Sequence, residues 1–145
     1  MYKFLIILHI ITSSVFLLVA IAVTAKSVAG WSKNLKYSKT DKYMAYLFMA
    51  LLYLTLVHGI IMYFFIDPSS KLTMDIQYAI RQASLRFWVV EHFYFMTFAL
   101  VLAQIGGIFI RKTTSHKNRF AYASFYYGIA TFITIISVTF YFIYR

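Results

Sequence analysis

Three of the four histidines in this chain lie inside long apolar stretches, where titratable side chains are uncommon. They are His9, His58 and His92. An ionisable group is costly inside a membrane, so such residues usually face protein and mark a functional site. A neutral imidazole can ligate haem iron, copper or zinc, and it can also relay protons. These three residues are therefore the first candidates for chemistry, whereas His116 lies in a basic segment and is expected to face water.

The residue types and motifs that the sequence contains or lacks exclude several kinds of catalytic and metal site. The sequence contains no cysteine, which excludes thiolate metal sites and thiol catalysis. It also contains no P-loop, dinucleotide-binding, zincin or serine-hydrolase motif. Arg86 and Glu91 precede His92 closely. We expect Glu91 to pair with Arg86 across slightly more than one helical turn, or with a histidine on a neighbouring helix, and Arg86 to suit a haem propionate or an acidic headgroup.

The composition places these histidines in a membrane. Of the 145 residues, 62% are hydrophobic and only 12% are charged, whereas about a quarter of the residues in a soluble domain are charged. A soluble protein of this size could not bury so much apolar surface. The composition therefore excludes a disulfide-rich secreted scaffold, a disordered chain and a free cytosolic enzyme.

Four apolar runs are each long enough to cross a hydrocarbon core about 30 Å thick, which needs roughly 20 helical residues. They cover residues of about 4–25, 43–66, 87–110 and 120–144. Backbone polar groups in lipid must be satisfied within the segment, so each run should be a helix. The sequence thus predicts a single integral membrane domain over residues 1–145, an all-α four-helix transmembrane bundle.

The basic residues predict the orientation of this bundle. Nine lie in the first and third connections: Lys26, Lys33, Lys36, Lys39, Lys42, Arg111, Lys112, Lys117 and Arg119. Five lie on the other side: Lys3, Lys71, Arg81, Arg86 and Arg145. The positive-inside rule then puts the first and third connections in the cytoplasm and both termini outside. The net charge of +10 is explained by topology and anionic headgroups, so we expect no nucleic-acid partner.

Two segments allow a second interpretation. The first apolar run contains an Ala20-Ile21-Ala22 pattern typical of a signal-peptide cleavage site, but the five lysines that follow oppose translocation. In the second connection, residues 67–86, apolar side chains recur every three or four positions. This spacing predicts a short amphipathic helix on the outer surface, with a partly helical loop as the alternative.

The helical spacing around the histidines indicates which faces they share. His9 continues along its helix face into Thr12, Ser13, Phe16 and Ala20, which are mostly small or hydroxylated. His92 shares a face with the series Ala99-Ala103-Gly107, which is typical of membrane helices that approach closely. We expect the three imidazoles to converge in the outer half of the membrane.

Two imidazoles on facing helices can ligate one haem iron axially. In an up-and-down bundle the first and third helices are diagonal, which favours His9 and His92 as the pair, with His58 able to replace either one. Two other interpretations stay open. Each histidine can be structural, bonded to a hydroxyl or carbonyl group, or the three can form a copper, zinc or proton-relay site.

Four short motifs, spread over nearly the whole chain, carry a resemblance. They are Leu8-His9, Gly30-Trp31 in the first basic connection, His58-Gly59, and the run from Arg86 through Phe87-Trp88-Val89-Val90-Glu91 to His92. Together they are similar to a family of small four-helix bacterial membrane proteins labelled cytochrome b-like. The chain departs from that family after His9, where Ile10 to Ser14 include no arginine.

The resemblance implies haem b and one-electron transfer near the outer face of the bacterial cytoplasmic (inner) membrane. It makes His9, His58 and His92 the candidate iron ligands, with Arg86 and Glu91 beside them. The chain would then be an electron carrier or accessory subunit rather than a free-standing enzyme. Its partners would be a quinol, a periplasmic redox protein or a larger membrane complex. The alternatives are a cofactor-free small subunit or assembly factor of such a complex, and a histidine-based metal or proton module.

Overall fold

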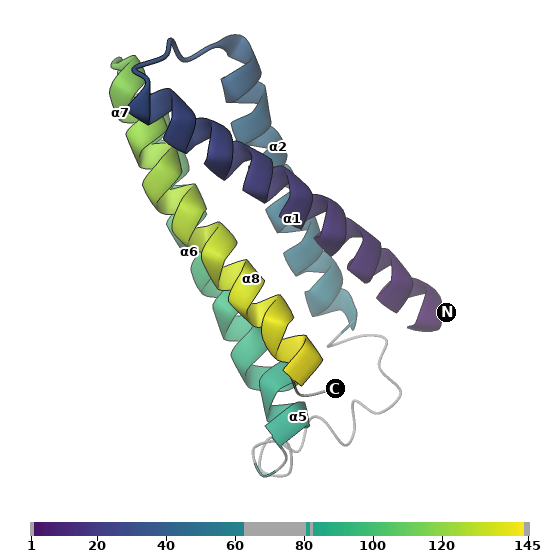
Figure 1. Cartoon of the computed structure of the whole chain (residues 1–145). Coiled ribbons are helices and arrows are strands. Elements are labelled where there is room, and N and C mark those ends of the chain that lie inside the picture. Colours follow the sequence, from purple (N-terminus) through teal and green to yellow (C-terminus); the bar gives the residue numbers. More distant parts are fainter. Residues whose placement is uncertain (1, 63–80, 82, 144–145) are drawn as a thin grey trace.

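The computed structural model of the chain describes residues 2–62, 81 and 83–143 (Figure 1). The described residues form helices and short connections and contain no strand. Four helical spans among them are long and apolar enough to cross a membrane: Lys3–Ser32, Lys39–Ile61, His92–Lys112 and His116–Phe140. For the described residues the all-α prediction is therefore confirmed, with four helices long and apolar enough to cross a membrane, as in a multi-pass membrane protein.

The helices follow one another with few breaks. They are α1 (Tyr2–Ser32), α2 (Lys39–Ile61), α5 (Ala83–Arg86), the π-helical η2 (Phe87–Glu91), α6 (His92–Lys112), α7 (His116–Tyr122), the π-helical η3 (Ala123–Tyr127) and α8 (Gly128–Ile143). The segments α5, η2 and α6 follow each other without a break, as do α7, η3 and α8. A π-helical turn inserts an extra residue, so each of these two long helices changes the direction of its side chains partway along.

The first helix continues beyond the predicted end at Ala25 to Ser32. Gly30 lies in its last turn, where an added Cβ would come within 2.6 Å of the Phe120 ring, so this turn is packed rather than solvated. Beyond Ser32 the chain turns at Asn34, whose φ of 52° is left-handed, and Leu35 donates its N–H to the Gly30 carbonyl at 2.9 Å. The pair Gly30-Trp31 is therefore helical, whereas the sequence predicted that it would lie in a loop.

Side-chain caps determine where the next spans begin. Ser38 Oγ accepts the Asp41 N–H at 3.3 Å, and Asp41 Oδ2 accepts the Ser38 N–H at 2.8 Å, so a capping box starts α2 at Lys39 rather than near residue 43. Ser115 Oγ accepts the Asn118 N–H at 3.3 Å and starts α7 at His116 rather than near residue 120. Both predicted connections are thus shorter in the structure.

The second connection is only partly described. The predicted end of the second span near residue 66 and the predicted amphipathic segment at 67–86 fall mainly outside the described residues. Of that segment, residue 81 and residues 83–86 are helical, the latter as α5.

The helices pack so that α1 and α6 each lie between α2 and the long helix α7–η3–α8. The first and third spans therefore occupy diagonal positions. The core is formed mainly by buried apolar residues from all four spans: Phe16, Ala20, Val23, Ala45, Phe48, Leu52, Ala99, Ala103, Ile110, Ala123, Tyr127 and Ala130. At its centre the Phe48 ring meets Phe16 edge-on at 5.2 Å and stacks on Tyr127 at 4.5 Å.

The small residues of α6 are buried, as their spacing predicts. Ala99, Ala103, Gly106 and Gly107 all lie on the packed face. A Cβ added at Gly106 would overlap the Cβ of Tyr126 in η3, so the two backbones approach as closely as a glycine allows.

The four spans are not equally close along their length. Figure 1 shows α1 and α2 diverging from α6 and α8 toward the end where α1 begins and α8 ends, which we call the terminal end. At the opposite end α1 connects to α2 and α6 connects to α7, and we call this the loop end. The candidate functional site lies at the terminal end.

Candidate functional site

A cavity of about 90 Å³ lies among the four spans in the half of the molecule nearer the terminal end. Its walls are mostly apolar, with a few polar groups. The lining residues are His9, Ser13, Phe16, Leu52, Thr55, Leu56, Gly59, Ile60, His92, Phe93, Met96, Thr134 and Val138. The cavity therefore brings together two of the three histidines that the sequence singles out.

His9 reaches the cavity from α1. Its Nδ1 is buried and has no hydrogen-bond partner among the described residues. The ring lies against α2, since a Cβ added at Gly59 would sit 3.6 Å from His9 Cε1. A buried polar atom without a partner is unusual in a folded protein and indicates that a water molecule or a ligand completes its bonding.

His92 reaches the same cavity from the first turn of α6. Its Nδ1 lies 2.7 Å from the hydroxyl of Ser137 on α8, and that serine is 1% exposed. The Phe87 ring lies beside it, with ring centroids 6.0 Å apart. The hydrogen bond to Ser137 restricts the rotation of the imidazole.

Ser137 is not among the residues that the sequence singled out as candidates. A signal for it exists, because Thr131, Thr134 and Ser137 recur every three residues in a mostly apolar helix, and all three are buried. Thr131 also meets Thr24 of α1, with their hydroxyl oxygens 3.1 Å apart. Hydroxyls on one face of a membrane helix indicate the face that packs against protein.

His58 lies near the cavity but does not line it. Its Nδ1 is buried and, within the described part of the chain, has no hydrogen-bond partner. His58 directly precedes Gly59, and a Cβ added at Gly59 would lie 3.6 Å from His9 Cε1, so His58 and His9 lie at a similar level of the two helices. The three histidines therefore share one layer of the protein, and His9 and His92 face the common space.

Arg86 and Glu91 form the expected pair at the terminal end. Arg86 Nε lies 2.9 Å from Glu91 Oε1, and both side chains are partly exposed. The two residues are five apart, which brings them to one face because the π-helical η2 lies between them. The hydrogen bond to Glu91 uses the Nε–H of Arg86. The other N–H groups of the Arg86 guanidinium can donate to a second acidic group.

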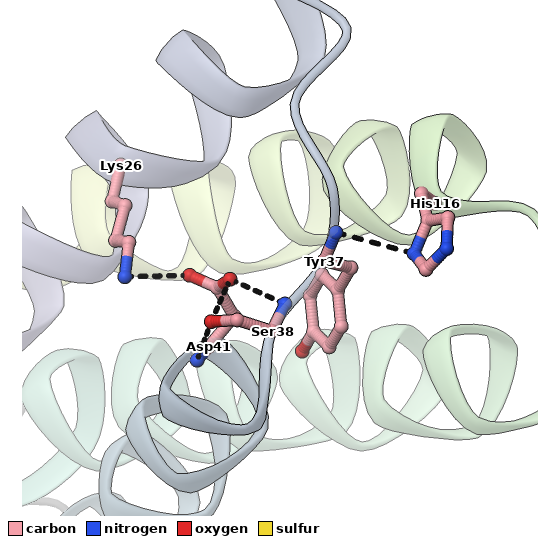
Figure 2. A network of polar contacts seen from close by, with 5 residues as sticks. All are labelled: Lys26, Tyr37, Ser38, Asp41 and His116. Atoms are coloured by element: carbon pink, nitrogen blue, oxygen red, sulfur yellow. Dashed lines mark hydrogen bonds and ion pairs between the residues drawn. The ribbon is translucent and has the colours of Figure 1, made fainter.

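A second polar cluster lies at the loop end (Figure 2). Lys26 Nζ lies 2.8 Å from Asp41 Oδ1, and the Asp41 side chain is only 7% exposed. Tyr37 donates its backbone N–H to His116 Nδ1 at 3.2 Å, so His116 is exposed as expected but also holds the first connection against α7. This cluster contains a single carboxylate and lies apart from the histidine cavity.

The described residues contain no group of three or more histidine, aspartate or glutamate side chains placed to hold a metal ion. A copper or zinc centre built from three imidazoles therefore has no preformed geometry in this part of the chain. A haem iron needs only two axial protein ligands, and the cavity supplies two imidazoles. Comparisons with protein-family models, with curated proteins and with solved structures find no match to this chain.

Proposed function

We propose that this chain binds one b-type haem and transfers single electrons near the outer face of a bacterial cytoplasmic (inner) membrane. The observation that carries the proposal is that His9 and His92, on diagonal helices, line one cavity with largely apolar walls. Such a pair of helix-borne imidazoles is a common way to hold haem iron in a helical bundle.

The types of residue that line the cavity are suited to binding a haem. A ligating histidine commonly donates its second ring N–H to an oxygen acceptor, and Ser137 Oγ offers that acceptor to His92. His9 presents a buried nitrogen that lacks a partner among the described residues. Phe16, Leu56 and Met96 supply apolar surface for the edges of the macrocycle.

The volume of the cavity limits how a haem can bind. A space of about 90 Å³ has room for a few water molecules and is smaller than a porphyrin. Haem binding therefore requires α1 and α2 to separate further from α6 and α8 at the terminal end. Figure 1 shows that the backbones of these pairs diverge toward that end.

The chain's own residues would have distinct roles. When bound, the haem supplies reversible one-electron iron chemistry, with a potential that depends on the axial ligands and on burial. His9 and His92 would hold the iron, and His58 is the substitute ligand nearest to them. Arg86, oriented by Glu91, would bond a propionate. A quinol, a periplasmic redox protein or a larger membrane complex would exchange electrons with the protein, which acts as a carrier or accessory subunit.

The proposal is tested by absorption spectroscopy of the full chain. The protein is expressed with added haem, purified in mild detergent and examined by a reduced-minus-oxidised spectrum. We expect Soret and α bands of a low-spin haem at about one haem per chain. His9→Ala and His92→Ala should each abolish the low-spin signal, because each removes one axial ligand.

His116→Ala is the matched control, because His116 is exposed at the loop end. It should leave the spectrum unchanged. Absence of both bands in the purified protein would contradict haem binding. A full spectrum in both His9→Ala and His92→Ala would show that the ligand pair is wrong, and its loss in His58→Ala would identify the replacement.

The orientation is part of the same proposal: a four-helix transmembrane bundle with both termini outside, because nine of the fourteen basic residues lie in the first and third connections. The chain has no cysteine, so single cysteines can be introduced without background labelling. In intact cells, a membrane-impermeant maleimide should label Lys3→Cys and leave Lys36→Cys unlabelled until the membrane is permeabilised. Labelling of Lys36→Cys in intact cells would reverse the orientation.

The small volume of the cavity favours one other function. Water molecules could satisfy His9 and His92 without any haem, as in a cofactor-free subunit or assembly factor, or in a histidine-based proton module. A purified protein that shows no haem bands and no metal would support this second candidate.

A further inference from the structure

Most of the basic residues at the loop end are exposed, and only Lys26 among the exposed ones forms an ion pair with a described residue. The others are Lys33, Lys36, Lys39, Lys42, Arg111, Lys112 and Lys117. Within the residues that the structure describes, Asp41 is the one acidic residue at this end, since Glu91 lies at the terminal end. The loop end therefore carries a concentrated positive charge.

Neither Asp41 nor Tyr37 offsets this charge. The Asp41 carboxylate is paired with Lys26 at 2.8 Å and is nearly buried, so its charge is already compensated inside the protein. Burial, and then the charge of Asp41, raises the pKa of Tyr37 to about 12, so the phenol stays neutral at physiological pH. The exposed lysines thus need counterions from outside the chain.

The two connections that carry these lysines are held together. Tyr37 in the first connection donates its N–H to His116 at the start of α7 (Figure 2). The Tyr37 ring packs edge-on against Phe120, with ring centroids 5.1 Å apart. The Arg119 guanidinium lies over the same ring at 5.4 Å. The lysines before and after Tyr37 therefore lie on the same surface as the lysines at the end of α6 and the start of α7.

We propose that this surface binds the phosphate groups of anionic phospholipids, with Lys33 and Lys36 from one connection and Lys112 and Lys117 from the other. These residues lie at or just beyond the ends of membrane-spanning helices, where headgroups are found. The charges are spread over two connections, which matches several headgroups in a leaflet rather than one small ion. The proposal does not depend on haem.

The test measures lipid preference by native mass spectrometry of the full chain in detergent. The probe is an equimolar mixture of phosphatidylglycerol, which is anionic, and phosphatidylcholine, which is zwitterionic. Wild type should retain mainly phosphatidylglycerol. The double variants Lys33→Gln/Lys36→Gln and Lys112→Gln/Lys117→Gln should each reduce that preference at least about fivefold, because each lysine near an anionic surface contributes roughly that factor.

The control Lys3→Gln/Arg81→Gln removes the same charge from exposed positions of the terminal end and should keep the preference. An unchanged preference in both loop-end variants, or an equal loss in the control, would overturn the proposal. Displacement of the bound lipid by excess inorganic phosphate would also overturn it, because the site would then bind a free anion. Lys36→Gln alone, the smallest perturbation, should still give a measurable loss, and the helical circular dichroism of every variant should match wild type.

Discussion

Gly106→Ala should lower the thermal stability of the protein strongly, whereas Gly107→Ala, one residue further along α6, should leave it unchanged or raise it. A Cβ at Gly106 would overlap the Cβ of Tyr126, which is attached to the η3 backbone and cannot rotate away. The two helices must then separate, and forcing an extra methyl group into packed surroundings costs about 1–3 kcal/mol. Unfolding temperatures in detergent, followed by circular dichroism, give the comparison.

Gly107 is a close control because it lies on the same packed face. There an added Cβ would meet Arg111 Nη1 and the Tyr127 hydroxyl at 3.5 Å, an ordinary contact. Alanine is also favoured over glycine within a helix by about 1 kcal/mol, so the loss at Gly106 occurs despite that gain. Equal unfolding temperatures for the two variants would show that α6 and η3 are not packed as closely as described.

Asp41→Ala should also destabilise the protein, by about 2 kcal/mol, since it removes one half of a capping box and leaves Lys26 without its partner. Asp41 accepts from both the N–H and the hydroxyl of Ser38, at 2.8 and 2.7 Å. The ion pair contributes less than a fully buried one, because the Lys26 side chain is 49% exposed and can return to solvent. Loss of the cap should shift the start of α2.

Asp41→Asn separates the two contributions, because the amide oxygen can still accept from Ser38 while the charge is lost. It should reduce the unfolding temperature by less than Asp41→Ala. The control Lys42→Met changes an exposed neighbouring position and should have little effect. If Asp41→Ala unfolded at the wild-type temperature, neither the capping box nor the ion pair would contribute to stability.

The sequence predicted the number and character of the spans because that property depends on local composition. A helix that crosses lipid needs a long apolar run whatever surrounds it, and four such runs are visible in the chain. The close-packing face of α6 was also predictable, because Ala99, Ala103 and Gly107 recur at helical spacing. The pairing of Arg86 with Glu91 was expected from their closeness in the sequence, although the π-helical η2 is what brings these two positions to one face.

The ends of the helices were not predictable from the apolar runs. Lys26 ends the first apolar run, yet α1 continues to Ser32 because Asp41 of α2 compensates the lysine and Phe120 covers Gly30. Each of these contacts joins residues far apart in the chain. Hydropathy contains no information about such pairs.

Residue types and helical spacing alone predicted an all-α membrane protein with three histidines inside its apolar spans. Only the tertiary structure decided that His9 and His92 face a common cavity while His58 lies beside it, and that Ser137 orients His92. The physical reason is rotation about the helix axis. Where an imidazole points depends on how its helix packs and on the π-helical turn before His92, and both are decided by contacts between helices rather than within them.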